Sequence, residues 1–141
     1  MPGRNLSRSS YQGNNQYIDN VRYDITSHWG AIMTSKITVK MNTCDKTHMI
    51  TADMNADGNV DIEIESDCEK VQDFNKRLRY LTMTDVTDYY NSRLIDPEVR
   101  GPFGHVCLII NAVTHAAWME YGLLSERHAK KSKNNSIVYG E

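Results

Sequence analysis

The fold is decided by residues 36–65, which read KITVKMNTCDKTHMITADMNADGNVDIEIE. Apolar and polar residues alternate over residues 37–41 and again over residues 60–64. This period of two is typical of half-buried β-strands. A shorter apolar run lies between them at residues 49–52, and the Asp-Gly pair at residues 57–58 favours a hairpin turn. We therefore predict three strands in an antiparallel meander with one apolar face that needs cover.

Helical patterns follow the strands and would supply that cover. Residues 66–69 have the form of a capping box, with serine as the N-cap and Cys68 in the first helical turn. The apolar stripe of this helix is predicted to consist of Val71, Phe74, Leu78 and Leu81. We expect a weaker helix over residues 84–90, a long buried helix over residues 104–121, and a short final strand at residues 137–139.

The first 35 residues differ in composition from the rest. They are rich in Ser, Asn, Gln, Arg and Tyr, and their apolar residues are scattered singly. Such a segment buries too little surface to offset its ordering entropy. We predict a disordered or loosely docked extension over residues 1–35, with a start at Met33 as an alternative interpretation. The fold class of residues 36–141 is then a single α+β domain, a three-stranded meander packed against two or three helices.

Charge and hydropathy limit the possible partners. The formal net charge is −2, from 16 basic and 18 acidic residues, which predicts no strong attraction to nucleic acid or to anionic membranes. No apolar run approaches the ~20 residues of a membrane span, and the first 20 residues do not resemble a secretory signal. We expect a cytoplasmic protein that is a monomer or a weak dimer, in which cysteines stay reduced or bind metal.

Residues 53–61 imitate the first half of a calcium-binding loop. Oxygen-bearing side chains alternate from Asp53 through Asn55 and Asp57, and Gly58 stands at the sixth position. The twelfth position should be a bidentate glutamate, but it is Ile64. A plain hairpin turn explains the same residues, and we prefer it to the calcium site.

The chain has three cysteines, and they are its strongest chemical feature. Cys44, Cys68 and Cys107 each fall at the predicted end of a strand or start of a helix, where backbone amides and the helix dipole favour a thiolate. They also fall outside the apolar stripes, and an odd number cannot form a closed set of intrachain disulfides. Asp45 and His105 are the oxygen and nitrogen candidates for a further ligand. We predict a thiolate metal site that holds Zn²⁺ or an iron–sulfur cluster.

Two other interpretations remain open. The cysteines could be small buried hydrophobes in a structural or interaction domain. Alternatively, one reactive cysteine could perform redox or acyl chemistry, with Cys107 and His105 as a thiolate–imidazolium pair. No nucleophile, base and orienting group stand out together, so we predict no catalytic residue.

Over residues 36–131 the sequence resembles the NifU/IscU-type scaffolds of iron–sulfur cluster assembly. The resemblance consists of Cys44-Asp45, Ser66-Asp67-Cys68 and His105-Val106-Cys107, in the order and near the intervals of that family. The glycine that usually separates the first cysteine from its aspartate is missing, and so is the Leu-Pro-Pro-Val-Lys docking motif. The sequence is also similar to small uncharacterised three-cysteine proteins of anaerobes.

The resemblance implies a fold and a function. It implies a NifU/IscU-like domain whose three cysteines hold an iron–sulfur cluster, with Asp45 controlling cluster release. It also implies a scaffold or carrier role, with sulfur-donor or cluster-recipient proteins as partners.

Overall fold

A computed structural model describes residues 34–140, so residues 1–33 of the extension predicted for residues 1–35 lie outside the described residues. The first strand already begins at Ser35. The elements in chain order are β1 (Ser35–Met41), β2 (Lys46–Met54), β3 (Val60–Ser66), α2 (Glu69–Leu78), β4 (Tyr80–Leu81), α3 (Met83–Thr87), the 3-10 helices η2 (Tyr89–Asn91) and η3 (Arg93–Ile95), α4 (Pro97–Arg100), α5 (Ile109–Glu120) and α6 (Glu126–Ser132).

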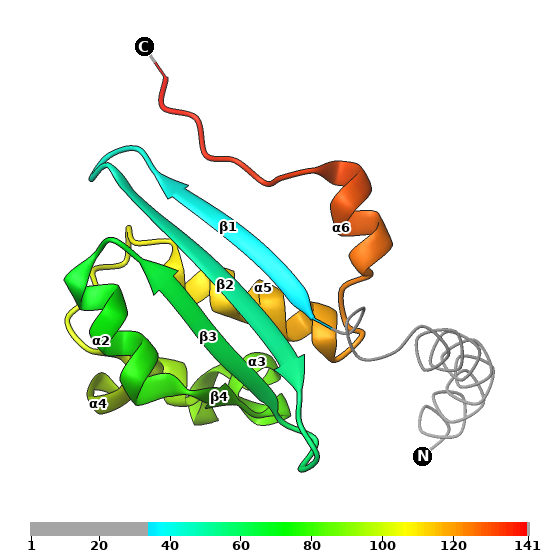
Figure 1. Cartoon of the computed structure of the whole chain (residues 1–141). Helices are drawn as coiled ribbons and strands as arrows, with labels where there is room; N and C mark the ends of the chain where they lie inside the picture. Colours follow the sequence, from blue (N-terminus) through cyan, green and yellow to red (C-terminus); the bar gives the residue numbers. More distant parts are fainter. Residues whose placement is uncertain (1–33, 141) are drawn as a thin grey trace. The chain divides into compact units, whose positions relative to one another are not determined.

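The α+β class and the antiparallel meander are confirmed. β1 pairs with β2 and β2 with β3, and the short β4 adds a fourth strand beside β3 (Figure 1). The fourth strand corrects the predicted stripe of α2, because Leu81 lies in β4 and not in the helix. The helix ends at Leu78 since Arg79 takes a φ of 61° and turns the chain back toward the sheet.

The hairpin between β2 and β3 is also confirmed. Gly58 has a φ of 81°, in the region that glycine adopts without strain. The carboxamide oxygen of Asn55 accepts hydrogen bonds from the N–H groups of Asp57 at 2.9 Å and Asn59 at 3.1 Å. The oxygen that resembled a calcium ligand therefore holds the turn together.

The core lies on one face of the sheet. α5 packs against β1 and β2, and α2 packs along β3. Phe74 of α2 is completely buried and meets the ring of Phe103 edge to face, with ring centroids 5.5 Å apart. The opposite face is exposed and polar, with Lys36 and Lys40 on β1 and an acidic row on β3. β1 forms one edge of the sheet because, within residues 34–140, it pairs only with β2.

Several helix boundaries differ from the predictions. The N-cap of α2 is Cys68 and not Ser66, whose hydroxyl accepts the Cys68 N–H instead. α5 begins at Ile109, later than predicted. The predicted helix over residues 84–90 divides into α3 and η2, and the predicted strand at residues 137–139 is exposed and irregular.

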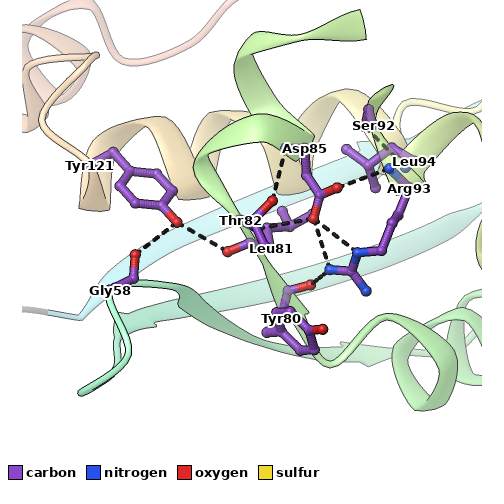
Figure 2. A network of polar contacts seen from close by, with 9 residues as sticks. All are labelled: Gly58, Tyr80, Leu81, Thr82, Asp85, Ser92, Arg93, Leu94 and Tyr121. Atoms are coloured by element: carbon purple, nitrogen blue, oxygen red, sulfur yellow. Dashed lines mark hydrogen bonds and ion pairs between the residues drawn. The ribbon is translucent and has the colours of Figure 1, made fainter. Parts of the chain in front are cut away.

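A buried carboxylate joins β4, α3 and η3. Asp85 accepts hydrogen bonds from the Thr82 N–H at 2.9 Å and from the Arg93 N–H at 2.9 Å (Figure 2). The Arg93 guanidinium pairs with the same carboxylate at 2.8 Å and also donates to the Tyr80 carbonyl. The Tyr121 hydroxyl lies 3.1 Å from the Gly58 carbonyl and 3.2 Å from the Leu81 carbonyl, and its single proton, shared between them, ties the end of α5 to the sheet. These contacts fix α5 and the connecting segments relative to the strands.

Candidate functional site

Two of the three cysteines lie at the same end of the sheet. Cys44 sits in the turn between β1 and β2, and Cys68 follows the end of β3. Asp67 joins the two segments, because its carboxylate accepts the Thr47 N–H at 3.0 Å and its carbonyl accepts the Lys46 ammonium at 3.2 Å. The start of α2 is therefore tied to the turn that carries Cys44.

The direction of α5 brings the third cysteine to this end. At the C-terminus of α5, Glu120 accepts hydrogen bonds from the Ser35 hydroxyl and, at 3.0 Å, from the Met54 N–H. Ser35 begins β1 and Met54 ends β2, so this helix end lies at the opposite end of the sheet from the β1–β2 turn. α5 spans about 18 Å and β1 about 23 Å, so the residues just before the helix start lie near the turn end. Cys107 lies just before that start, and Figure 1 shows the turn, the beginning of α2 and the approach to α5 together.

The electrostatics of Cys107 support this juxtaposition. Burial raises the pKa of the Cys107 thiol, and negative charge on Cys44 and Cys68 raises it further. The Ile109 N–H and the Arg100 guanidinium act in the opposite direction. The other two sulfurs are thus close enough to influence the Cys107 thiol electrostatically.

The same balance corrects one expectation about Cys107. The helix-start amide of Ile109 does favour the thiolate, as predicted, but burial outweighs it and the pKa of Cys107 lies above its ordinary 9.0. The easy deprotonation predicted from the helix start is therefore wrong for this residue.

The three sulfurs differ in exposure. Cys44 is exposed, and its thiol makes a long contact of 3.8 Å to the Met41 carbonyl. Cys68 and Cys107 are half-buried against the hydrophobic core. The site therefore has one exposed and two half-buried thiols.

The predicted accessory ligands are both exposed. Asp45 follows Cys44 in the turn and has a φ of 56°, which is uncommon for a residue other than glycine. His105 lies in the turn before α5. Within the described range, no three or more His, Cys, Asp or Glu side chains are arranged to hold a metal ion. The three cysteines gather at one end without a finished ligand sphere.

Comparison with protein families matches residues 35–132 to a family of unknown function, DUF6951. The chain belongs to this family. The match covers β1 through α6 and includes all three cysteines. Searches of curated proteins and of solved structures each returned no match. No helix among residues 34–140 is long and apolar enough to cross a membrane.

Two groups near the thiols of this DUF6951 member were not predicted from the sequence. Arg100 stands at the end of the short α4, and no local pattern linked it to Cys107. His48 is a fully buried residue of β2, bonded to Ser66. The alternation of β2 was sufficient to find His48, because it stands on the same strand face as Ile50 and Ala52.

Proposed function

We propose that this protein is a thiolate metal-site protein in which Cys44, Cys68 and Cys107 together bind an iron–sulfur cluster or Zn²⁺. The supporting observation is that three separate segments bring these cysteines to one end of the sheet. Thiolate sulfur is the preferred ligand of both metal groups. We propose that the protein works in the reducing cytoplasm, where the thiols stay available.

The residues around the sulfurs suit an ion held by thiolates. Arg100 supplies a positive charge that offsets the excess negative charge of three thiolates around a divalent ion. Asp45 and His105 are the candidates for the remaining position, and both stand on turns next to a cysteine. Completing the site requires these turns to close on the metal. Burial and the neighbouring negative charges make Cys107 hard to ionise alone, and a bound cation would reverse that balance.

The exposure of Cys44 favours a carrier or scaffold over a purely structural site. A closed structural site encloses its ion, whereas a site with one exposed ligand can exchange its contents with a partner. This agrees with the resemblance to NifU/IscU-type scaffolds, with sulfur-donor or cluster-recipient proteins as the partners we propose. The meander packed on helices is consistent with the NifU/IscU-like fold we propose.

The test is anaerobic titration of the full chain with Co²⁺ and, separately, reconstitution with iron and sulfide. We expect a sulfur-to-cobalt charge-transfer band with one equivalent of Co²⁺, displaced by Zn²⁺. Each of Cys44→Ser, Cys68→Ser and Cys107→Ser should weaken binding at least tenfold. A wild-type chain that gives neither the cobalt band nor a cluster chromophore would refute the proposal.

The accessory ligands have matched controls in the same chain. Asp57 occupies the turn at the other end of β2, so Asp57→Ala controls for Asp45→Ala. His128 is an exposed histidine of α6 and controls for His105→Ala. Only the variant of the true ligand should shift the cobalt spectrum or increase the rate of metal loss to a chelator.

A second candidate function is a small structural or interaction domain with incidental cysteines. The packing of Cys68 and Cys107 against the core favours it, as does the absence of a finished ligand sphere in residues 34–140. If it holds, the variant with all three cysteines changed to alanine folds cooperatively and wild type retains no metal.

A further inference from the structure

A histidine is enclosed directly behind the thiol end of the sheet. His48 of β2 is only 1% exposed and lies on the core face of the strand. In the sheet register it stands between Val39 of β1 and Ser66 of β3. Enclosing an imidazole among apolar side chains costs free energy unless its polar atoms are bonded.

The polar contact of His48 leads to a cysteine. Its Nδ1 lies 2.7 Å from the Ser66 hydroxyl, and that hydroxyl accepts the Cys68 N–H at 2.9 Å. The Cys68 carbonyl in turn accepts the N–H groups of Val71 at 3.1 Å and Gln72 at 3.0 Å, the first hydrogen bonds of α2. Both backbone polar groups of Cys68 are therefore held, one by the helix and one by Ser66.

The Ser66 hydroxyl can serve both contacts at once. A serine hydroxyl has one proton and two lone pairs. Because its oxygen already accepts the Cys68 N–H, its proton is free to be donated to Nδ1 of a neutral imidazole. Burial lowers the pKa of His48, and the nearby Asp67 only partly opposes this, so the neutral ring is favoured. Nδ1 of His48, the Ser66 hydroxyl and the Cys68 N–H then each have a hydrogen-bond partner.

We propose that His48 is a positioning residue of the thiol cluster, acting through the Ser66 hydroxyl to fix the backbone of Cys68. The proposal deepens the proposed metal function, because it states what holds one ligand in place. Groups that orient metal ligands typically change metal affinity by about 10–100-fold when removed.

The test compares variants that break this path with variants that keep it. Ser66→Ala and His48→Leu remove the contact, whereas Ser66→Thr keeps a hydroxyl and His48→Asn keeps a polar atom near the position of Nδ1. The first readout is the alkylation rate of Cys68 in the folded, metal-free chain, measured by mass spectrometry with Cys44 as the internal reference. The second readout is Co²⁺ affinity.

We expect Ser66→Ala and His48→Leu to speed alkylation of Cys68 several-fold relative to Cys44 and to weaken Co²⁺ binding about tenfold or more. Ser66→Thr and His48→Asn should stay near wild type in both readouts. If His48→Leu fails to fold, Ser66→Ala and the conservative pair still decide the question.

Ser92→Ala is the matched control. The Ser92 hydroxyl accepts the Leu94 N–H at 3.0 Å, the same two-residue contact, but in the network around Asp85. This variant should lose stability without changing Cys68. The proposal is overturned if Ser66→Ala behaves like Ser92→Ala, with an unchanged alkylation ratio. If wild type binds no cobalt, the proposed metal function is refuted. The Cys68 alkylation rate then still shows whether His48 positions Cys68.

Discussion

Replacing Asp85 with alanine should be among the most costly single changes in this fold. Its side chain is only 3% exposed, and its carboxylate takes hydrogen bonds from two backbone N–H groups and from the Arg93 guanidinium. Removing one partner of a buried ion pair typically costs about 3–5 kcal/mol. Arg93 is 29% exposed, so water can partly rehydrate it, and we expect the lower end, about 3 kcal/mol. Stabilities of whole domains are about 5–15 kcal/mol, so this loss is large.

The assay is equilibrium urea unfolding followed by circular dichroism. Asp88→Ala is the control, because the Asp88 carboxylate is partly exposed and, among residues 34–140, accepts a side-chain hydrogen bond only from Asn91, at 2.8 Å. That change should cost less than about 1 kcal/mol. A cost for Asp85→Ala no greater than that of Asp88→Ala would refute the assignment of Asp85 as the anchor of this region.

The pH dependence gives a second check on Asp85. Burial alone would raise its pKa, but hydrogen bonds from the Arg93 and Thr82 N–H groups and the Arg93 guanidinium hold the pKa below the ordinary 3.8. A carboxylate with a lowered folded-state pKa stabilises the protein above its unfolded-state pKa, and this contribution is lost as the pH falls through the folded-state value. The stability difference between wild type and Asp85→Ala should therefore be constant above about pH 5 and shrink below pH 3.8.

Four further outcomes are expected. Gly101→Ala should cost about 1–3 kcal/mol in urea unfolding, because the residue has a φ of 76° and a Cβ would lie 2.2 Å from Nη2 of Arg77; an unchanged midpoint would contradict this. Phe74→Ala should cost about 3–5 kcal/mol, since the ring is fully buried, and a loss below 1 kcal/mol would show that the core can collapse around it. Burial lowers the pKa of His48, against the opposing charge of Asp67, so the free energy of unfolding should fall as the pH drops below 6.5. His48→Asn should make the free energy of unfolding less dependent on pH in this range, and an unchanged pH dependence would refute the assignment of this effect to His48. Burial raises the pKa of Cys107, so its alkylation by iodoacetamide should be slow at pH 7 and accelerate above pH 9; a fast reaction at neutral pH would contradict the burial argument.

The strands were predictable because their signal is local. Alternation over residues 37–41 and 60–64 fixes which side chains face the core, and the Asp-Gly turn fixes the hairpin. β4 was missed because two residues carry no period, and its pairing depends on Arg79 reversing the chain. The capping box of α3 was missed because Asp85 takes the place usually held by Glu or Gln.

The candidate site was predictable only in part. The positions of the three cysteines at segment ends predicted that their side chains lie near one another. Their spacing along the chain does not indicate the burial or the charged neighbours of each thiol. The burial that raises the pKa of Cys107 and the guanidinium of Arg100 both arise from tertiary packing. Sequence reasoning placed Ser66 as the N-cap, whereas the structure gives that place to Cys68 and turns the serine toward His48.

The lysines of β1 have a consequence for self-association. β1 is an edge strand, and Lys36 and Lys40 stand on its exposed face on either side of Thr38. If a second molecule laid its own β1 antiparallel against this edge, centred on Thr38, each Lys36 would face a Lys40 at about 5 Å. The repulsion between these ammonium groups discourages such sheet extension. Exchanging both lysines for threonine would remove this barrier and favour, in concentrated solutions, a two-fold dimer with one sheet continuous across both molecules.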